Sequence, residues 1–254
     1  MRSVRRRGIR WQLDLRETID FSIYLTGYFQ RPVINQIAKL IPNDAVVIDI
    51  GANRGSMSIQ IARLCSRCEL LAVEPADEMI HKIRDLIHAN PGIGSRIRVE
   101  QIFLASGSSI GDEQRPHLVD ASWNLFDVSQ RNPLTGATAV SASQCVVETL
   151  DSLVKRNSLR RVDLIKLDVD GYELGVLQGG SDTFLGLRPI VVSEWAPFSL
   201  FQRGVSPDNV LELWRSYGYT SFRIRRFGRP IQISWRELLA VKHHDSMEIL
   251  LLPN

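Results

Sequence analysis

The segment VVIDIGANRG, at positions 46–55, constrains the fold of this chain more than any other. Its first three residues are apolar and β-branched, which is typical of a strand buried in a parallel sheet. Asp49 follows at the strand's carboxyl end, and Gly51 and Gly55 complete a D-x-G-x-x-x-G spacing. Apolar residues then recur at helical intervals, at Met57, Ile61 and Leu64. The segment predicts a strand, a glycine turn and a helix, the unit that holds nucleotide-like ligands in α/β sheets.

The acid in this turn indicates which ligand it holds. A dinucleotide's diphosphate is bound by a G-x-G-x-x-G turn, which is absent here. Asp49 would repel a diphosphate and attract a cationic cofactor. S-adenosyl-L-methionine carries a sulfonium and an ammonium group, so we expect it as the cofactor. Asp49, Gly51, Asn53 and Gly55 are the first candidate cofactor-binding residues.

Length and composition fit one α/β domain with extensions. The chain has 254 residues, of which 44% are hydrophobic and 23% charged, as in an ordinary soluble domain. We expect an N-terminal extension at 1–40, with a strand at 9–15 and two short helices, that forms a lid or an interface. A cofactor-binding domain at 41–254 follows, interrupted by a loop insertion at about 106–144 that is rich in Ser, Gly, Asn and Pro.

Strands and helices alternate along the second part, which predicts an α/β fold with a mostly parallel sheet and helices on both faces. Strands are expected at 46–50, 70–73, 98–105, 164–168 and 189–193. Helices are expected up to 64 and at about 79–87, 150–156, 172–177 and 207–217, the last capped by Ser206. Segments 220–224 and 247–252 are expected to pair as an antiparallel C-terminal edge hairpin.

The net charge and the apolar runs of the sequence limit the classes of partner and the location that we expect. The net charge of +3 is too small to indicate nucleic acid. Five arginines crowd positions 2–10; we interpret them as a solvated extension, the alternative being a basic arm that touches phosphate or membrane. No apolar run approaches the roughly 20 residues of a membrane span, and no apolar segment of a signal peptide precedes Trp11. The three cysteines fit a reducing, cytoplasmic location.

Polar residues stand at the carboxyl ends of the expected strands, where ligands bind in such sheets. Glu74 and Pro75 follow the second strand, and an acid about 20 residues beyond the glycine turn suits ribose hydroxyls. Glu74 alone would also fit as the cap of the next helix. The adenine is expected near the end of the third strand, at Ala105.

The fourth strand, DLIKLDVDG, carries a lysine among apolar residues. Period two places Lys166, Asp168 and Asp170 on one face. A Lys166–Asp168 ion pair is the purely structural interpretation; the functional one places Asp168 at the transferred methyl group. Gly171 would let the chain turn sharply into the next helix. Glu194 ends the fifth strand and adds a carboxylate to the same edge.

These segments together resemble the FkbM family of S-adenosylmethionine-dependent methyltransferases. The matching pieces are VVIDIGANRG, LLAVEP, VETLDSLV, VDLIKLDVDGYELGVLQGG, RPIVVSE and GVSPDNVLELWRSYGY, so the resemblance covers most of the chain. It implies a class I methyltransferase (Rossmann-like) fold that methylates hydroxyls on sugars or natural-product scaffolds. It also implies cofactor roles for residues 49–55 and Glu74 and a site role for 168–171. The family's usual D-V-E-G reads D-V-D-G here, with Asp170 one methylene shorter.

The function we expect is O-methylation, in which a general base removes the proton of an acceptor hydroxyl. Asp168 is the first candidate base, with Lys166 positioning it, Glu194 the second, and the pair at 243–244 a further alternative. Asp170, Gly171 and Trp123 are candidate substrate residues, Trp123 lying in the insertion expected to cover the acceptor. The partner is a small-molecule or glycan acceptor and not a nucleic acid; self-association stays open.

Three other functions stay open. Asp168, Asp170 and Glu194 could bind Mg²⁺ in a metal-assisted methyltransferase, although we expect no metal. The chain could also be a homologue that binds the cofactor without catalysis. A nicotinamide-dependent oxidoreductase would share the fold, but the dinucleotide turn and a Tyr-x-x-x-Lys relay are absent.

Overall fold

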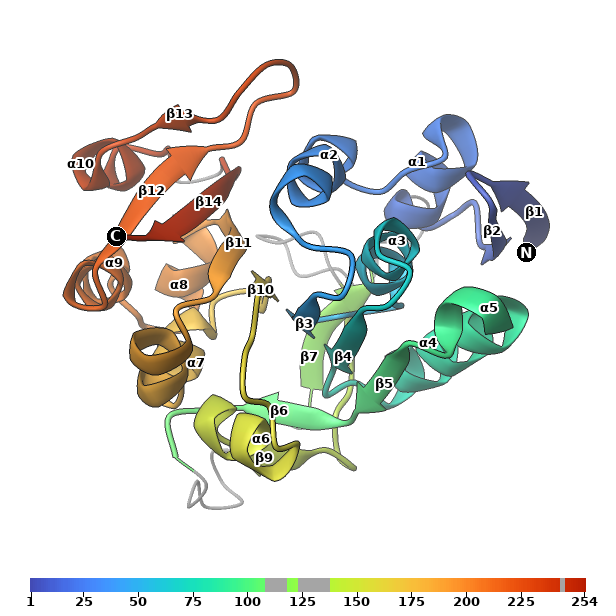
Figure 1. Ribbon diagram of the computed structural model, residues 1–254, viewed down its shortest axis with the longest axis horizontal. Helices are drawn as coiled ribbons and strands as arrows, with labels where there is room; N and C mark the ends of the chain where they lie inside the picture. The colour runs from blue at the N-terminus through green and yellow to red at the C-terminus, as the bar shows by residue number, and fades with distance from the viewer. Residues whose placement is uncertain (108–117, 123–137, 243–244) are drawn as a thin grey trace.

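The computed structural model describes residues 1–107, 118–122, 138–242 and 245–254. Its centre is an eight-stranded sheet with the order β13-β12-β14-β11-β10-β3-β4-β5 (Figure 1). The strands are β3 (Val46–Ile50), β4 (Glu69–Val73), β5 (Ile97–Glu100), β10 (Leu164–Leu167), β11 (Ile190–Trp195), β12 (Tyr219–Arg223), β13 (Ile231–Gln232) and β14 (Met247–Pro253). The five strands from β11 to β5 are parallel, and β14, β12 and β13 are antiparallel. The expected α/β sheet with an antiparallel C-terminal pair is confirmed.

The strand order reverses at β3, and this reversal determines where a ligand can bind. From β3 the chain proceeds outward through β4 to β5, and it later returns to place β10 on the other side of β3. Crossover connections leave in opposite directions from this point, so a crevice opens beyond the carboxyl ends of β3 and β10. Residues 49–55 and 168–171 both lie at these ends.

Helices cover both faces of the sheet, because successive side chains of each strand point to opposite faces. One apolar core holds Ile48, Leu71 and Ile165 against α6 (Leu150–Arg156), α7 (Glu173–Gln178) and α9 (Pro207–Ser216). The other holds Val47, Leu70 and Leu164 against α1 (Thr18–Thr26), α2 (Arg31–Leu40), α3 (Ser56–Leu64) and α4 (Asp77–Ala89). In Figure 1 the first group lies left and below, and the second lies right.

The arginine-rich start of the chain is a mostly exposed strand, which the sequence did not predict. β1 (Arg2–Arg6) pairs antiparallel with β2 (Ile9–Leu13), the strand expected at 9–15. Alternate residues of β2 are buried, namely Ile9, Trp11 and Leu13. The alternation of arginines with smaller residues in β1 carries little apolar signal, since that strand is mostly exposed. The two short helices expected after it are α1 and α2.

The strand expected at 98–105 is two strands, because the chain leaves the main sheet after β5. β6 (Ile102–Leu104) pairs in parallel with β9 (Val146–Glu148) in a small separate sheet. β7 (Leu118–Ser122) and β8 (Thr138–Ser141) form a third pair within the expected loop insertion. The apolar residues of β6 thereby face the ligand edge instead of continuing the sheet.

Four short elements lie outside the sequence expectations. They are α5 (Pro91–Gly94), the π-helix η2 (Thr183–Leu187), α8 (Pro197–Gln202) and α10 (Trp235–Leu239). Each spans four to six residues, which is too short to show a helical period in sequence.

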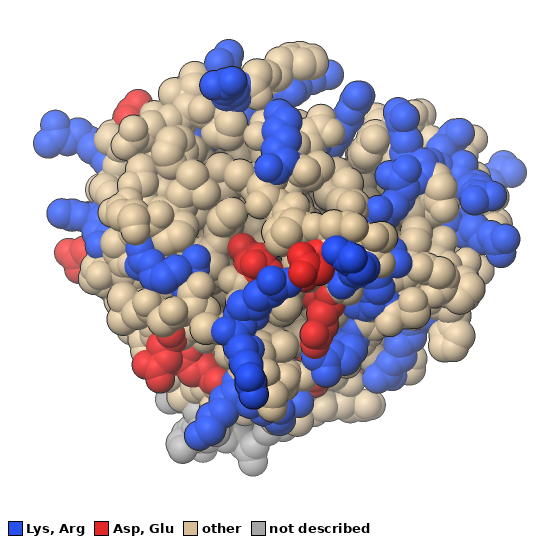
Figure 2. All heavy atoms as spheres, viewed as in Figure 1, with Lys and Arg blue, Asp and Glu red and all other residues tan. Residues whose placement is uncertain are grey.

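No helix within the described ranges is long and apolar enough to cross a bilayer. In the view of Figure 2, acidic side chains gather near the centre of the face, with basic side chains on either side.

Candidate functional site

The glycine turn after β3 lies directly against the chain that leaves β10. Gly51 has a φ of +77°, and a Cβ there would lie 1.7 Å from the carbonyl oxygen of Asp168. No side chain fits in that space, and the backbone conformation itself favours glycine. The turn is held on its other side by the backbone amides of Gly51 and Ala52, which both donate to the carbonyl of Val73 at 3.0 Å. The turn therefore joins the ends of three adjacent strands.

A cavity of about 580 Å³ opens beyond these strand ends. Its walls are two acids at strand ends (Glu74 and Asp168), the turn after β3, and the apolar residues of β6. The full lining is Ile50, Gly51, Asn53, Val73, Glu74, Pro75, Ile102, Phe103, Leu104, Val119, Asp168, Val169, Asp170, Tyr172 and Arg203. Phe103 and Tyr172 meet edge to face, with ring centroids 4.9 Å apart. A polar end and an aromatic end suit a nucleoside.

Glu74 is buried at the polar end of this cavity. Its Oε2 accepts the backbone N–H of Asn53 at 2.8 Å, and its Oε1 accepts that of Ala76 at 2.9 Å. It is therefore not a side-chain cap of α4, whose first residue is Asp77. Burial raises the pKa of Glu74 to about 7, against the pull of those two hydrogen bonds. Each carboxylate oxygen keeps a further lone pair, so neighbouring ribose hydroxyls could still donate to it.

Three candidate cofactor residues, Asp49, Gly55 and Ala105, do not line the cavity. Asp49 is completely buried beneath the turn, where its Oδ2 accepts the hydroxyl of Ser58 at 2.5 Å. Its Oδ1 has no hydrogen-bond partner among the described residues, and burial raises its pKa. Ala105 lies under α7, where its carbonyl would be 2.1 Å from a Cβ on Gly179. Asp49 can therefore act on a ligand only through its field, and the apolar wall of the cavity is formed by Phe103 and Leu104, not by Ala105.

Gly55 and Pro75 take different positions at this edge. Gly55 has a φ of +80° and immediately precedes α3. A Cβ there would meet the side chain of Ile83 from α4 at 3.3 Å. Its role in this structure is thus to start α3 close to α4. Pro75 lines the cavity beside Glu74.

The lysine in β10 forms the ion pair expected as its structural interpretation. Lys166 is 3% exposed, and its Nζ lies 2.5 Å from Oδ2 of Asp168. Burial alone would lower the pKa of Lys166, but the carboxylates of Asp168 and Asp49 outweigh it and raise that pKa. Lys166 is directly opposite Asp49 in the parallel register of β10 and β3. The ammonium therefore stays charged between the two acids.

Two further acids extend this polar group across the sheet. Glu194 of β11 is directly opposite Glu248 of β14. Burial and the charge of Asp168 raise the pKa of Glu194 to about 7 and that of Glu248 to about 8. The amide of Gln30, just before α2, donates to Oε1 of Glu248 at 2.5 Å. At neutral pH Glu248 is therefore largely protonated and Glu194 is about half protonated.

A second cavity lies on the other side of Asp168. It is lined by the end of β10, the turn after β3, and side chains of the N-terminal segment and α8. Its lining is Thr18, Ile19, Phe29, Gln30, Gly51, Ala52, Asn53, Arg54, Ser56, Met57, Lys166, Asp168, Asp170, Glu194 and Phe198. Four residues line both cavities, namely Gly51, Asn53, Asp168 and Asp170. The two cavities thus meet at the glycine turn and the end of β10.

Backbone strain gathers at this meeting point. Among the described residues, six other than glycine have positive φ, and three of them line the second cavity: Gln30 (46°), Asn53 (50°) and Asp170 (48°). Such conformations cost free energy and persist where the surroundings impose them, commonly at functional sites. Next to Asp170, Gly171 has a φ of +98°, and a Cβ there would lie 2.3 Å from the carbonyl oxygen of Ser199. The expected sharp turn at Gly171 is confirmed.

Sequence reasoning missed several residues of the site. Arg203, after α8, lines the first cavity and stacks its guanidinium 4.6 Å from the ring centroid of Tyr172. Gln30 and Glu248 come from elements far apart in sequence. The aromatic residues of 195–203, a segment that ends at Arg203, were a weak signal. Only tertiary packing places Gln30 against Glu248.

Some expectations concern residues outside the described ranges. Trp123 and the pair at 243–244 are among them, so their candidate roles stay predictions. Within the described residues, no three His, Cys, Asp or Glu side chains are grouped so that they could hold a metal ion. Cys65 and Cys68, which stand in a C-x-x-C spacing, are both buried and free.

Fold and site together define a class I S-adenosylmethionine-dependent methyltransferase. The strand order, the glycine turn after the first core strand and the acid at the end of the next are shared with that class. The family model "Methyltransferase FkbM domain" matches residues 49–221. The chain belongs to the FkbM methyltransferase family, whose methyl donor is S-adenosylmethionine.

The relatives are distant. The chain is 30% identical over 194 residues to the AMB antimetabolite synthetase AmbE of Pseudomonas aeruginosa, covering 65% of this chain but only 9% of that synthetase. It is 25% identical over 206 residues to the 2-O-methyltransferase NoeI of Sinorhizobium fredii, covering 73% of this chain and 77% of that one. A crystal structure of a methyltransferase FkbM from Methylobacillus flagellatus superposes with a TM-score of 0.50 at 12% identity, covering 84% of this chain and 45% of that one.

Proposed function

We propose that this methyltransferase transfers the methyl group to a hydroxyl oxygen of a sugar, a glycan or a natural-product scaffold. The observation that carries the proposal is that the donor cavity and the second cavity meet at Asp168. A hydroxyl in the second cavity would lie beside a carboxylate able to accept its proton. When bound, the cofactor supplies a methyl group that its sulfonium already makes electrophilic.

In this proposal the donor cavity is the cofactor site. Glu74 would accept the ribose hydroxyls, and the apolar wall of Phe103 and Leu104 would hold the adenine. The turn at Gly51 and Asn53 would receive the methionine portion, with the buried charge of Asp49 behind it. Asp170 and Gly171 would shape the passage to the acceptor. The free lone pairs of Glu74 and the apolar wall of Phe103 and Leu104 fit this group.

The chain's own residues would handle the proton. Asp168 accepts it from the acceptor hydroxyl, and Lys166 fixes the orientation of Asp168 through their 2.5 Å ion pair. Glu194 lines the same acceptor cavity and has a pKa of about 7, which suits a group that exchanges protons near neutral pH. Asp168 and Glu194 would therefore act as a pair, with Asp168 closest to the donor.

The lining of the second cavity supports a hydroxyl acceptor that also has apolar surface. Ile19, Phe29, Met57 and Phe198 provide apolar contacts beside the polar side chains of the sheet edge. The relative NoeI is named as a 2-O-methyltransferase. Because Thr18, Ile19, Phe29 and Gln30 come from the N-terminal segment, we propose that residues 1–40 form a wall of the acceptor site.

A ligand panel tests the proposal. S-adenosylhomocysteine is expected to raise the melting temperature and NAD is not, because binding to the folded state stabilises it by RT ln(1 + [L]/Kd). Transfer of a labelled methyl group from S-adenosylmethionine to hydroxyl-bearing acceptors, with the label recovered as a methyl ether, would support O-methylation. Label recovered on nitrogen or carbon would refute the oxygen acceptor while leaving the donor site intact.

A further inference from the structure

A third cavity lies beside the acceptor cavity, under the N-terminal hairpin. It encloses about 1090 Å³ of space open to solvent and is lined by β2, the start of α1, the start of α3 and the exposed side of α4. The residues that matter here are Trp11, Asp14, Arg16, Arg54, Glu78 and Lys82. None of the residues that line the proposed cofactor site lines this cavity.

The third cavity adjoins the acceptor cavity at Arg54 and Ser56, which line both. Arg54 is fixed at this junction by a buried ion pair, with its Nη1 2.6 Å from Oδ2 of Asp20 and side-chain exposures of 10% and 2%. Its backbone N–H donates to Oδ1 of Asn53 at 2.7 Å, and Asn53 lines the cofactor cavity. The junction is thus tied to the turn at which the two other cavities meet.

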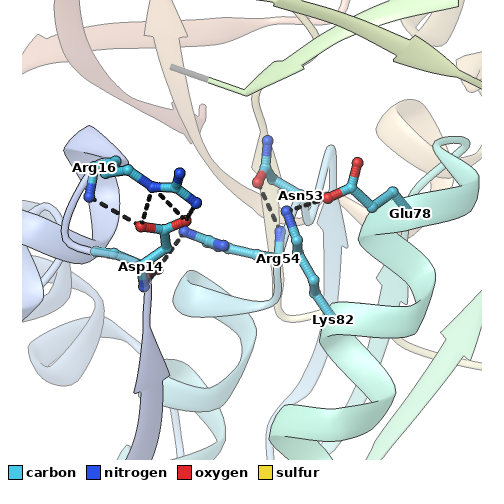
Figure 3. A network of polar contacts seen from close by, with 7 residues as sticks. Asp14, Arg16, Asn53, Arg54, Glu78 and Lys82 are labelled. Carbon is cyan, nitrogen blue, oxygen red and sulfur yellow. Dashed lines mark hydrogen bonds and ion pairs between the residues drawn. The ribbon is translucent and has the colours of Figure 1, made fainter. Parts of the chain in front are cut away.

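Ion pairs stand on opposite sides of the third cavity. Arg16 and Asp14 contribute one from the segment after β2, and Lys82 and Glu78 contribute another from α4, each at 2.6 Å. Figure 3 shows these pairs facing one another, with Arg54 and Asn53 between them. Paired donors and acceptors on both walls suit a ligand that offers both kinds of hydrogen bond, as hydroxyl groups do.

The charge of the side chains that line the cavity limits the class of ligand it can bind. Five acidic and three basic side chains line the cavity, a net charge of −2, so a polyanion would be repelled. Trp11 adds an indole ring that is 2% exposed, and its Nε1 has no hydrogen-bond partner among the described residues. An unpaired buried donor is costly, and a ligand hydroxyl oxygen would satisfy it. An indole beside paired polar groups suits a neutral sugar ring.

We infer that this cavity is a second acceptor subsite, which binds a neutral saccharide unit of an extended acceptor whose neighbouring unit is methylated beside Asp168. The inference rests on the proposed function for the identity of the methylated group. It adds that chain length, and not only the reacting unit, determines which acceptor the enzyme takes. The N-terminal hairpin then serves as a wall that selects the acceptor.

Binding of glucose, cellobiose and cellotriose tests this inference without any methyl transfer. The probe is the indole ¹H–¹⁵N signal of Trp11, assigned by its loss in Trp11→Phe. We expect cellotriose to shift this signal with a dissociation constant at least fivefold below that of glucose. In Lys82→Gln this preference should shrink at least threefold, because the charged ammonium opposite Arg16 and its ion pair with Glu78 are lost. The exposed Lys39→Gln on α2 is the matched control and should keep the full preference.

The outcomes separate the two proposals. Equal dissociation constants for the three sugars, or an indole signal that stays still at saturation, would overturn the second subsite. Preferential binding of an oligogalacturonate of equal length would overturn the neutral class of ligand. If S-adenosylhomocysteine stabilises the protein but no hydroxyl acceptor is methylated, the proposed function fails, while the indole titration still decides the subsite.

Discussion

Gly51 is the residue on which the site depends most closely, because backbone from two strands meets there. In Gly51→Ala, the new Cβ would lie 1.7 Å from the carbonyl oxygen of Asp168 at a φ of +77°. We expect a loss of at least about 2 kcal/mol in unfolding free energy and loss of S-adenosylhomocysteine binding, measured by denaturant titration and calorimetry. Gly92→Ala is the control, since nothing lies within 4 Å of its new Cβ. Unimpaired ligand binding by Gly51→Ala would contradict the geometry.

In the proposed mechanism, proton removal depends on Asp168. Asp168→Asn removes the proton acceptor but keeps the size of the side chain, so kcat should fall by about 10²- to 10⁴-fold. The dissociation constant of S-adenosylhomocysteine should change little, because Glu74 and the glycine turn remain. Asp163→Asn is a suitable control on the same segment, since Asp163 hydrogen-bonds the backbone of Val46 at the far end of β10. A kcat within threefold of wild type would exclude Asp168 as the base.

The raised pKa of Glu74 leads us to expect that cofactor affinity depends on pH. Its pKa of about 7 means that it is largely protonated at pH 6 and largely ionised at pH 8. Only the ionised carboxylate can accept from both ribose hydroxyls, so S-adenosylhomocysteine should bind about tenfold more tightly at pH 8 than at pH 6. Calorimetry at the two pH values measures this. In Glu74→Gln the affinity should be lower and nearly independent of pH; a retained tenfold change would assign the proton elsewhere.

At the residue scale, the residues that line the site were predicted from the sequence more accurately than the role of each one. Glu74, Asp168 and Asp170 stand at strand ends, and topology alone brings strand ends together. Asp49 also stands at a strand end, yet its side chain points beneath the turn, which the spacing of residues does not reveal. Gln30 and Arg203 could not be predicted, because their positions follow from how α2 and α8 dock on the sheet.

At the scale of elements, the pairing of β11 with β14 places two acids opposite each other. Glu194 and Glu248 have pKa values raised to about 7 and 8, above the ordinary value of 4.5. An acid whose pKa is higher in the folded state binds more protons there than in the unfolded state. The folded state is therefore stabilised below the ordinary pKa and loses that stability as pH rises through 7 to 8.

Glu248→Gln tests this pairing. The wild-type free energy of unfolding should fall between pH 6 and pH 8, with each raised acid contributing up to about 1.4 kcal/mol per pH unit. The variant should lose part of that slope and be more stable than wild type at pH 8, measured by urea titration at both values. The exposed Glu212→Gln of α9 is the control. An unchanged slope in Glu248→Gln would show that this carboxyl is not protonated in the fold.

Helices and strands were predicted well where a hydrophobic period extends over many residues. They were predicted poorly where contacts between distant segments determine the structure. The main strands and the long helices α3, α4 and α9 follow from periodicity. The division of 97–104 into β5 and β6 does not, since both halves are apolar enough for one strand and the break appears only when β6 pairs with β9. The strand β1 was not predicted because its pairing with β2 stabilises it, while its own composition shows no strand pattern.

For the whole molecule, the N-terminal 40 residues share a core with the sheet. Ile9, Leu13, Ile23, Val33 and Ile37 are at most 1% exposed and belong to the same cluster as Val47 and Leu164. Burying each such side chain contributes about 1.5 to 3 kcal/mol, and the five together contribute about as much as the whole net stability of an ordinary domain.

A chain of residues 41–254 alone is accordingly expected to lack a cooperative thermal transition and to expose apolar surface. Circular dichroism on heating and binding of a hydrophobic dye would measure both. The matched comparison is a chain that lacks residues 1–6 only, because β1 is mostly exposed and its loss should leave a cooperative transition. A cooperative transition of 41–254 with normal S-adenosylhomocysteine binding would show that the extension is a separate unit.

The contact between Gly51 and the carbonyl of Asp168 has a consequence for how such an enzyme can change its substrate. The glycine turn and the proposed base are in direct backbone contact, so neither can be altered without disturbing the other. The acceptor side is instead enclosed by replaceable parts, the hairpin, α1 and the loop before α2. New acceptors would then arise by exchanging this outer layer, and chimaeras that graft the first 40 residues of a relative onto this sheet are the natural route to redirecting methylation.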